Sequence, residues 1–157
     1  MIRLATEKDI EEILTLSSKA FGKHFHSKEH FEQTLTNETS IFVNDKGKIS
    51  AYCIILKEDN QVRIDSITVD ENERGKGIAS MLIEDVILNY GHLRIYTYAW
   101  KMKNGEVNLK VILERLGFKF VEEIKNMWYE DSKKTGFICP SCGNPCICSA
   151  LVYELTN

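Results

Sequence analysis

The sequence predicts an α+β protein built on one mixed β-sheet flanked by helices. Along several short segments apolar residues alternate with polar ones, which is typical of strands. Between these segments lie stretches whose apolar residues recur every three or four positions, which indicates amphipathic helices. In chain order the pattern reads strand, two helices, three strands, helix, strand, helix and two strands. Because strands and helices are interspersed in this way, we expect one sheet with helices packed on it.

Length and composition are those of an ordinary globular protein. The chain has 157 residues, of which 43% are hydrophobic and 27% charged, with a net charge of −3. We therefore expect a single domain over residues 1–157. The N-terminal residues are charged where a signal peptide would be apolar, and no apolar run approaches the ~20 residues of a membrane span. A cytoplasmic protein that binds neither membranes nor, given its acidic charge, nucleic acid is expected.

Two helices are expected near the N-terminus. The first begins after Thr6, where a hydroxyl followed by the carboxylate of Asp9 resembles a capping box. Its apolar stripe consists of Ile10, Ile13, Leu14 and Phe21. The second helix is expected over residues 27–35. A loop with several polar residues joins the two.

Three strands are expected to follow as a meander, over residues 41–43, 49–56 and 62–69. In the third, Val62 and Ile64 alternate in one phase, and Ile67 and Val69 in the other. A β-bulge at Asp65–Ser66 would bring both pairs to the same face. The alternative is a strand buried on both faces, where the phase carries no information.

A polar segment with two glycines lies between the third strand and the next helix. Residues 74–79 read Arg-Gly-Lys-Gly-Ile-Ala, and an amphipathic helix follows over 78–87. The first N–H groups of a helix have no partner within it, and the helix dipole adds about half a positive charge there. Glycine lets the backbone approach a ligand closely. The segment therefore predicts a phosphate-binding loop, with a plain glycine-rich turn that caps the helix as the alternative.

The C-terminal part is expected to hold a strand over 93–100, a helix over 107–118 and two strands within 118–130 and 146–155. A long loop would join the last two strands into a hairpin. Four of the five cysteines lie at residues 139–148, namely Cys139, Cys142, Cys146 and Cys148. In a reducing compartment four thiolates suit tetrahedral Zn²⁺, and Cys146 and Cys148 would share a face of the last strand. A loop of reduced cysteines with a reactive pair is the open alternative.

The glycine segment and its flanks resemble the GNAT superfamily of acyl-CoA-dependent N-acyltransferases. The pyrophosphate loop of that family reads Q/R-x-x-G-x-G/A, and Arg74, Gly77 and Ala79 match it. The strand before the loop, the helix after it and the later segment LERLGFKF follow the family's order of elements. The resemblance covers nearly all of residues 1–130.

This resemblance implies an N-acetyltransferase that moves an acetyl group from acetyl-CoA to a primary amine of an unidentified acceptor. Acetyl-CoA would lie in a V-shaped cleft where strands 62–69 and 93–100 separate. The residues implied to contact it are Ile67, Thr68, Val69, Arg74, Gly75, Lys76, Gly77, Ile78, Ala79 and Asn108. The implied partners are acetyl-CoA and the amine, with a homodimer left open. The second interpretation is a non-catalytic acyl-CoA-binding or protein-interaction module with a cysteine-rich metal or redox loop.

The resemblance also implies candidates for proton transfer. Asp65 lies four residues before Val69, where histone-acetylating members of the family keep a glutamate as base; a purely structural carboxylate is the alternative. The family often places a tyrosine general acid in a Y-x-x-x-G-F pattern, but Leu113 stands at that point and leucine cannot donate a proton. Tyr98, or Tyr96 on the same strand, is the expected replacement, with proton donation by water as a further alternative.

Three histidines, His24, His26 and His30, lie in and after the loop between the first two helices. His26 and His30 are four residues apart and could ligate a metal. Surface histidines are the favoured interpretation, since no carboxylate pattern accompanies them. Because this loop lines the acceptor pocket in the family that the sequence resembles, one of them could contact the substrate.

Overall fold

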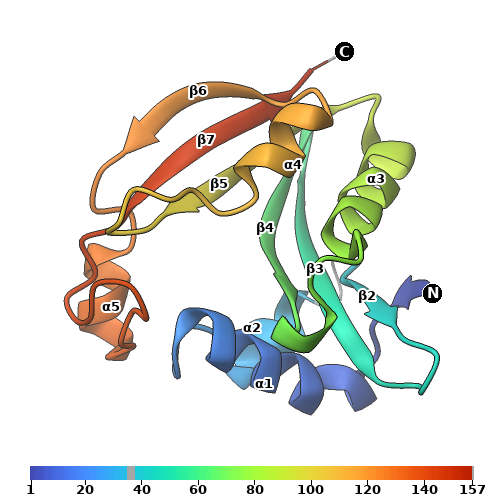
Figure 1. Ribbon diagram of the computed structural model, residues 1–157, viewed down its shortest axis with the longest axis horizontal. Coiled ribbons are helices and arrows are strands. Elements are labelled where there is room, and N and C mark those ends of the chain that lie inside the picture. Colours follow the sequence, from blue (N-terminus) through green and yellow to red (C-terminus); the bar gives the residue numbers. More distant parts are fainter. Residues whose placement is uncertain (35–37, 157) are drawn as a thin grey trace.

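The computed structural model describes residues 1–34 and 38–156 (Figure 1). Within these residues seven strands form one sheet in the order β1-β2-β3-β4-β5-β7-β6. The neighbours β4 and β5 are parallel, and the other neighbouring pairs are antiparallel. The mixed α+β fold predicted from the sequence is confirmed.

The strands and helices follow the predicted order, with one additional helix near the C-terminus. The strands are β1 (Ile2–Leu4), β2 (Ser40–Val43), β3 (Ile49–Glu58), β4 (Gln61–Val69), β5 (Arg94–Lys101), β6 (Lys119–Ile124) and β7 (Ser149–Leu155). The α-helices are α1 (Ile10–Phe21), α2 (Lys28–Thr34), α3 (Ile78–Tyr90), α4 (Lys110–Arg115) and α5 (Tyr129–Thr135), and the short 3-10 helices are η1 (Glu7–Asp9) and η3 (Glu71–Glu73). The predicted helix over 27–35 is α2, and its last expected residue, Leu35, lies outside the described residues.

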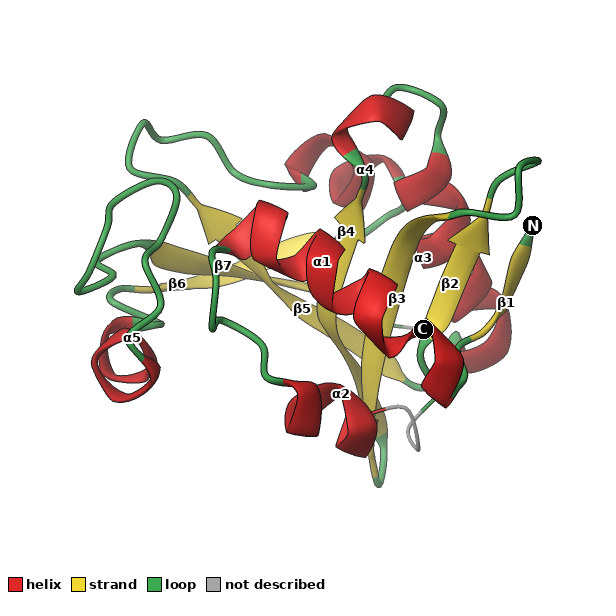
Figure 2. Cartoon of the chain, turned by 90° about the horizontal axis from the view of Figure 1, so that it is seen from below, coloured by secondary structure: helices red, strands yellow, loops and turns green. Residues whose placement is uncertain are grey.

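Helices cover both faces of the sheet (Figures 1 and 2). On one face α1 and α2 pack against β3, and Ile13, Phe31 and Tyr52 are buried between them. On the other face α3 and α4 pack on the sheet through a second core that includes Leu82 and Leu113. The two cores exist because alternate residues of a strand point to opposite faces of the sheet.

The predicted bulge is present in β4. Ser66 and Ile64 pair with adjacent residues of β3, so Asp65 between them is the extra residue. As a result Val62, Ile64 and Ile67 contribute to the same core. The change of phase in the sequence therefore comes from a bulge and not from a strand buried on both faces.

The sheet opens between β4 and β5 (Figure 1). Their parallel pairing joins Gln61–Ile64 to Arg94–Thr97 and ends there, although β4 continues to Val69 and β5 to Lys101. A cavity of about 430 Å³ is lined by residues of both strands beyond this point. The V-shaped cleft implied by the family resemblance is thus present.

The region after β5 differs from the prediction in three places. The helix expected over 107–118 is limited to α4, because Val107 pairs with Lys101 and Leu109 has a φ of 64°. Residues 131–135, for which the sequence predicts a loop, belong to α5, which begins at Tyr129 within the segment 118–130 expected to hold a strand. The last strand begins only at Ser149. Cys146 and Cys148 therefore precede the strand, and the prediction that they share a strand face is wrong.

No helix in the described part of the chain is both long and apolar enough to cross a membrane.

Candidate active site

The glycine loop between β4 and α3 leads directly into the first turn of α3, with Gly77 as the residue that precedes the helix. Gly75 and Gly77 have φ values of 81° and 76°, a conformation that glycine adopts without the strain other residues would incur. Apart from the glycine itself and its two chain neighbours, no described atom lies within 4 Å of the position that a Cβ would take on either glycine. The N–H of Met81 donates to the Gly77 carbonyl at 3.0 Å, so the N–H groups before Met81 have no partner within the helix.

The charged side chains of this loop are engaged by neighbours. Lys76 forms an ion pair with Glu73, which also accepts a hydrogen bond from Asn44 Nδ2 at 2.9 Å. These hydrogen bonds from Lys76 and Asn44 lower the pKa of the Glu73 carboxyl. Arg74 Nε donates to the Val69 carbonyl at 3.3 Å. The loop is thus held in shape by its side chains, and its backbone N–H groups lie at the N-terminus of α3, the positive end of the helix dipole.

The end of β4 forms one edge of the cavity. Asp65, Ser66 and Ile67 line it, whereas Thr68 and Val69 are not among its described lining residues. The Thr68 hydroxyl instead donates to the Tyr52 hydroxyl at 3.3 Å. In the described sheet, the residues of β4 beyond Ile64 pair with β3 alone, so their other backbone edge faces the opening.

Asp65 lies at the bulge and contacts two basic side chains. Its Oδ1 atom accepts a hydrogen bond from Arg63 Nη2 at 3.0 Å, and its Oδ2 atom lies 3.6 Å from His30 Nε2. Burial acts to raise the pKa of this carboxyl, but its interaction with the nearby His30 ring and the charge of Arg63 outweigh burial and lower the pKa below its ordinary value. Asp65 is therefore ionised at neutral pH.

Two of the three histidines lie in the cleft, so the expectation of surface histidines is correct for His24 alone. His26 and His30 line the cavity, and their rings stack with centroids 4.7 Å apart and planes at 8°. His26 Nδ1 lies 2.8 Å from Ser17 Oγ. Burial, with a smaller effect of the neighbouring His30, lowers the pKa of His26 to about 4. The His26 ring is therefore neutral at pH 7.

The two imidazoles and the bulge carboxylate form a compact group. Ligand atoms of His26, His30 and Asp65 lie within 4.8 Å of one another, a spacing that a metal ion could bridge. Arg63 already pairs with Asp65 and adds positive charge at this point. The arrangement is thus better suited to moving or holding a proton than to binding a metal ion.

The two candidate tyrosines have different surroundings. Tyr98 lines the cavity, whereas Tyr96 is not among its described lining residues. The Tyr96 hydroxyl donates to Glu58 Oε1 at 2.7 Å, and burial together with that carboxylate raises the pKa of Tyr96 to about 12.

Leu113 lies on α4, and its side chain is fully buried in the core. Asn108 does line the cavity, and its N–H donates to the Trp100 carbonyl at 2.8 Å.

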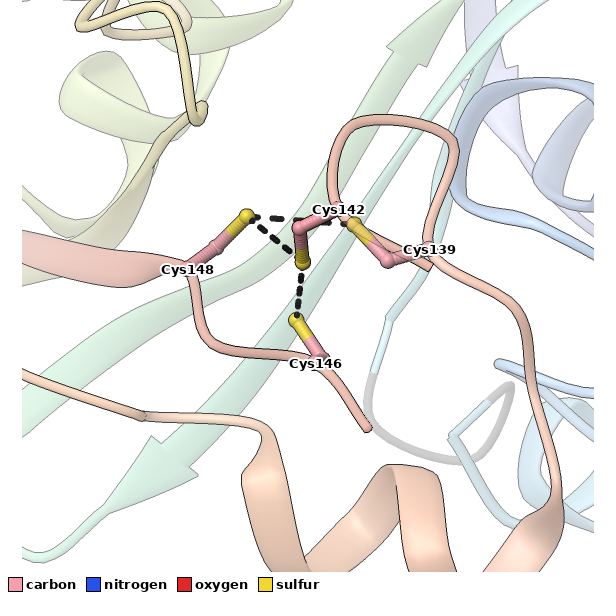
Figure 3. Close-up of side chains that lie close together, drawn as sticks. All are labelled: Cys139, Cys142, Cys146 and Cys148. Carbon is pink, nitrogen blue, oxygen red and sulfur yellow. Dashed lines mark hydrogen bonds between the residues drawn. The ribbon is translucent and has the colours of Figure 1, made fainter. Parts of the chain in front are cut away.

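The four clustered cysteines point toward one another (Figure 3). Their Sγ atoms are 3.8 Å apart for Cys139 and Cys148, 3.6 Å for Cys142 and Cys146, and 3.3 Å for Cys142 and Cys148. Sulfurs bound to one tetrahedral zinc at ~2.3 Å are separated by roughly 3.8 Å, whereas a disulfide measures ~2.05 Å. These three separations equal or fall somewhat below the value for sulfurs on one zinc, and all four sulfurs lie within 4.8 Å of one another, close enough to ligate one metal ion.

The backbone around the cysteines forms a compact turn. Cys139 and Gly143 exchange two backbone hydrogen bonds of 3.1 and 2.9 Å, and the N–H of Ile147 donates to Cys142 Sγ at 3.3 Å. Burial acts to raise the pKa of Cys142, but the Ile147 N–H and the neighbouring thiols lower it overall. Burial raises the pKa of Cys148 to about 11 and also raises that of Cys146. Among these three thiols only Cys142 thus has a lowered pKa, and a bound metal would favour the thiolate form of all of them.

Solved structures with the same fold cover almost the whole chain. An N-acetyltransferase from Staphylococcus aureus Mu50 aligns with 99% of this chain and 97% of its own, at 19% identity and a TM-score of 0.73. A phosphinothricin acetyltransferase from Sinorhizobium meliloti, in complex with AcCoA, aligns over 99% and 86% at 14% identity and 0.72. A GNAT family acetyltransferase from Elizabethkingia anophelis with acetyl-CoA bound aligns over 100% and 97% at 21% identity and 0.71.

No curated protein sequence matches the chain. Residues 8–118 match the family described as the acetyltransferase (GNAT) family. This segment contains the bulge, the glycine loop and the opening between β4 and β5, and it makes up well over half of the 157 residues. The chain therefore belongs to the acetyltransferase (GNAT) family.

Proposed function

We propose that this protein transfers an acetyl group from acetyl-CoA to a primary amine. The observation that carries the proposal is the opening of the sheet between β4 and β5 next to the glycine loop. The loop offers N–H groups to a diphosphate, and the open edge of β4 offers backbone groups to an extended chain. Two solved structures of the same fold, from Sinorhizobium meliloti and Elizabethkingia anophelis, hold acetyl-CoA.

Acetyl-CoA is proposed to bind along both features. Its pyrophosphate would contact the loop residues Arg74, Gly75, Lys76, Gly77, Ile78 and Ala79. Its pantetheine arm would pair with the backbone of Ile67, Thr68 and Val69 in the manner of an added strand. Asn108, which lines the cavity, is proposed to contact it as well. The open space above Gly75 and Gly77 supports this assignment, because a side chain there would occupy the space of the ligand.

The chemistry requires removal of a proton from the amine. An alkyl ammonium has a pKa near ~10.4, and its nitrogen can attack the thioester carbonyl only after losing a proton. The ionised carboxylate of Asp65, beside the cavity, is proposed to draw that proton away and pass it to solvent. A C–N bond then forms, the nitrogen releases its second proton to solvent, and the C–S bond breaks. The departing thiolate takes a proton that we assign to the Tyr98 hydroxyl, which regains one from solvent.

The second candidate function is a module that binds acyl-CoA without catalysis. It is favoured by one observation, the buried Leu113 at the position where the family often has a tyrosine acid. In this case acetyl-CoA would bind, and no amine would be acetylated at a rate above that of the free reactants. The position of Tyr98 in the cavity favours the enzyme.

We further propose that Cys139, Cys142, Cys146 and Cys148 bind one Zn²⁺ ion. The sulfur separations of 3.3 to 3.8 Å support this, as does the N–H of Ile147 aimed at Cys142 Sγ. Four protein thiolates complete a tetrahedral shell, so such an ion would have a structural function and would not activate water.

A thermal-shift series tests the proposed function first. Acetyl-CoA, CoA and NADPH are compared at equal concentration, since a ligand that binds the native state raises its stability with ln(1 + [L]/Kd). A rise in melting temperature with the two CoA species alone is expected. Release of free CoA thiol in the presence of a panel of primary amines then separates the enzyme from the binding module. Equal shifts with NADPH, or none with any ligand, would reject the acetyl-CoA site.

A further inference from the structure

The cysteine lobe, defined here as residues 129–148, is held together by its own hydrogen bonds. Asn144 Nδ2 donates to the carbonyl oxygens of Ser132 and Phe137 at 2.8 and 2.9 Å. The N–H of Cys146 donates to Ser132 Oγ at 2.8 Å. Because α5 is tied to the thiol cluster in this way, a rearrangement of the four thiols displaces the helix as well.

This lobe has only a small apolar core. Its buried members are Phe137, Cys139, Cys146 and Cys148, and the side chains packed against them are Phe25, Trp100, Trp128 and Cys142. A core of this size contributes little burial free energy, and structures of this size commonly depend on a metal or on disulfides. The shape of the lobe therefore depends on the metal proposed to occupy its centre.

The lobe lies against the end of α1 (Figure 1). Gly22, which follows α1, approaches the lobe so closely that a Cβ on it would lie 2.3 Å from the Ile138 carbonyl oxygen. The rings of Phe25 and Phe137 meet edge to face with centroids 4.9 Å apart. The lobe thus packs against the segment that joins α1 to α2, and Phe25 and Phe137 from the two sides of this contact both line the cavity.

The cavity is strongly aromatic where it reaches the lobe. The rings in its lining are those of Phe21, Phe25, Tyr98, Trp100, Trp128 and Phe137, and the lobe also contributes Cys139 and Cys146. None of the loop residues 74–79 is among the described lining residues. The aromatic part of the cavity is therefore separate from the proposed pyrophosphate site.

Two carboxylates accompany these rings. Asp65 of β4 and Asp131 of α5 both line the cavity, and the guanidinium of Arg63 is already paired with Asp65. A primary ammonium is attracted by carboxylates and by the faces of aromatic rings. An apolar ring attached to that amine would bury its surface against the aromatic side chains. The aromatic rings and the carboxylates together are thus complementary to an ammonium group attached to an apolar ring.

From these contacts we infer that the aromatic part of the cavity is the acceptor subsite and that it binds a primary amine attached to an apolar ring. Metal binding by the cysteine lobe keeps in place the lobe residues that line this subsite. The inference rests on the proposed acetyltransferase function and on the proposed zinc site. It predicts that loss of zinc weakens acceptor binding and leaves acetyl-CoA binding at the glycine loop unchanged.

The test compares two amines in the presence and absence of zinc. The probes are phenethylamine and propylamine, and the Michaelis constant for each is measured by release of CoA thiol. Zinc content is measured by elemental analysis, and the affinity for acetyl-CoA by calorimetry. In the zinc-loaded protein the Michaelis constant for phenethylamine should lie at least about tenfold below that for propylamine, because the ring adds buried apolar area.

Zinc is removed from the wild-type protein with a chelator and then restored. Removal should raise the Michaelis constant for phenethylamine on the order of tenfold, with the affinity for acetyl-CoA unchanged, and restored zinc should reverse the change. Cys142→Ser should behave like the metal-free protein. Ile138→Ser is the matched control, because Ile138 lies in the same lobe with an exposed side chain and no thiol. If Cys142→Ser does not fold, the chelation series alone still shows whether loss of zinc raises the Michaelis constant for phenethylamine.

The outcomes separate this inference from the proposed function. A zinc-loaded protein that does not bind acetyl-CoA rejects the proposed function itself. A protein that binds acetyl-CoA but acetylates both amines with equal Michaelis constants, or neither amine, overturns the acceptor class alone. A Michaelis constant that stays the same after complete removal of zinc overturns the role of the lobe. A parallel loss of acetyl-CoA affinity would also overturn that role, because the effect would then extend to the whole fold.

Discussion

The Nε2 atom of His30 lies 3.6 Å from the Oδ2 atom of Asp65 and joins α2 to the bulge of β4. The bulge makes this contact feasible, because the extra residue turns Asp65 out of the regular alternation of the strand. Arg63 contacts the other carboxylate oxygen at 3.0 Å. The carboxylate is therefore kept ionised beside the cavity, where a cationic amine would arrive.

Replacing Asp65 by asparagine should lower turnover by about two orders of magnitude, the usual contribution of a positioned acid or base. The binding of acetyl-CoA should remain unchanged, since the side chain faces α2. The matched control is Asp59→Asn, because Asp59 is an exposed carboxylate in the turn between β3 and β4. Equal turnover in both variants would remove Asp65 from the proton path.

The same substitution has a pH-dependent effect on stability. The pKa of Asp65 is lowered in the folded protein, so the carboxylate stabilises the fold above its unfolded pKa of ~3.9, and this contribution is lost as the pH falls through the folded pKa. Wild type should therefore be more stable than Asp65→Asn at pH 7, and the difference should shrink below about pH 4. Urea denaturation of both proteins at several pH values measures this difference in the free energy of unfolding. A difference independent of pH would show that charge is not its cause.

His26 should make the fold sensitive to mild acid. Its pKa is lowered to about 4, so between pH 6.5 and 4 the unfolded chain binds a proton that the folded chain does not, and stability falls as the pH falls. The loss amounts to about 3 kcal/mol across this range. His26→Asn, which keeps a polar atom near Ser17, should flatten the slope, whereas His24→Asn should keep it. Parallel slopes in all three proteins would contradict the buried neutral imidazole.

Gly77→Val should weaken acetyl-CoA binding by an order of magnitude or more, because valine is strained at a φ of 76° and fills the space above the loop. Gly47→Val is a matched control. Gly47 has a φ of 78° in the turn between β2 and β3, again with no described atom within 4 Å of a Cβ. Both variants should lose similar stability in thermal melts, while calorimetry should detect weaker binding in Gly77→Val only. Equal affinities would exclude the loop as the diphosphate site.

Tyr98→Phe should slow turnover at least about tenfold if its hydroxyl protonates the departing thiolate. Tyr96→Phe removes a hydroxyl from the same strand that is bonded to Glu58 at 2.7 Å, and it should affect stability more than turnover. Steady-state rates with saturating acetyl-CoA compare the two. A larger loss of rate in Tyr96→Phe would place the acid at Tyr96.

The element order and the bulge could be predicted because both depend on local apolar periodicity. Val62 and Ile67 fall in opposite phases, and a bulge is the local structure that reconciles them. The glycine loop could be predicted for a similar reason, because a strand, two glycines and an amphipathic helix follow one another directly. In each case the signal lies within a few consecutive residues.

The structure of the lobe and the place of the histidines could not be predicted in this way. Residues 129–135 have no apolar stripe, and α5 is supported by Ser132 and Asn144, which meet only in the folded chain. His26 and His30 reach Asp65 through the packing of α2 on the sheet. Contacts between residues so far apart in the sequence leave no periodic signal in either segment.

The pairing between β4 and β5 runs from Gln61 to Ile64 on one strand and from Arg94 to Thr97 on the other. This short seam alone connects the two halves of the described sheet through strand pairing, with β1 to β4 on one side and β5 to β7 on the other. The short pairing is thus a narrow hinge between two hydrogen-bonded halves of the sheet. The angle between the halves at this hinge determines how wide the opening is. A ligand that bonds to both halves would stiffen the hinge, and slower exchange of the amide hydrogens of Arg63 and Tyr96 would report it.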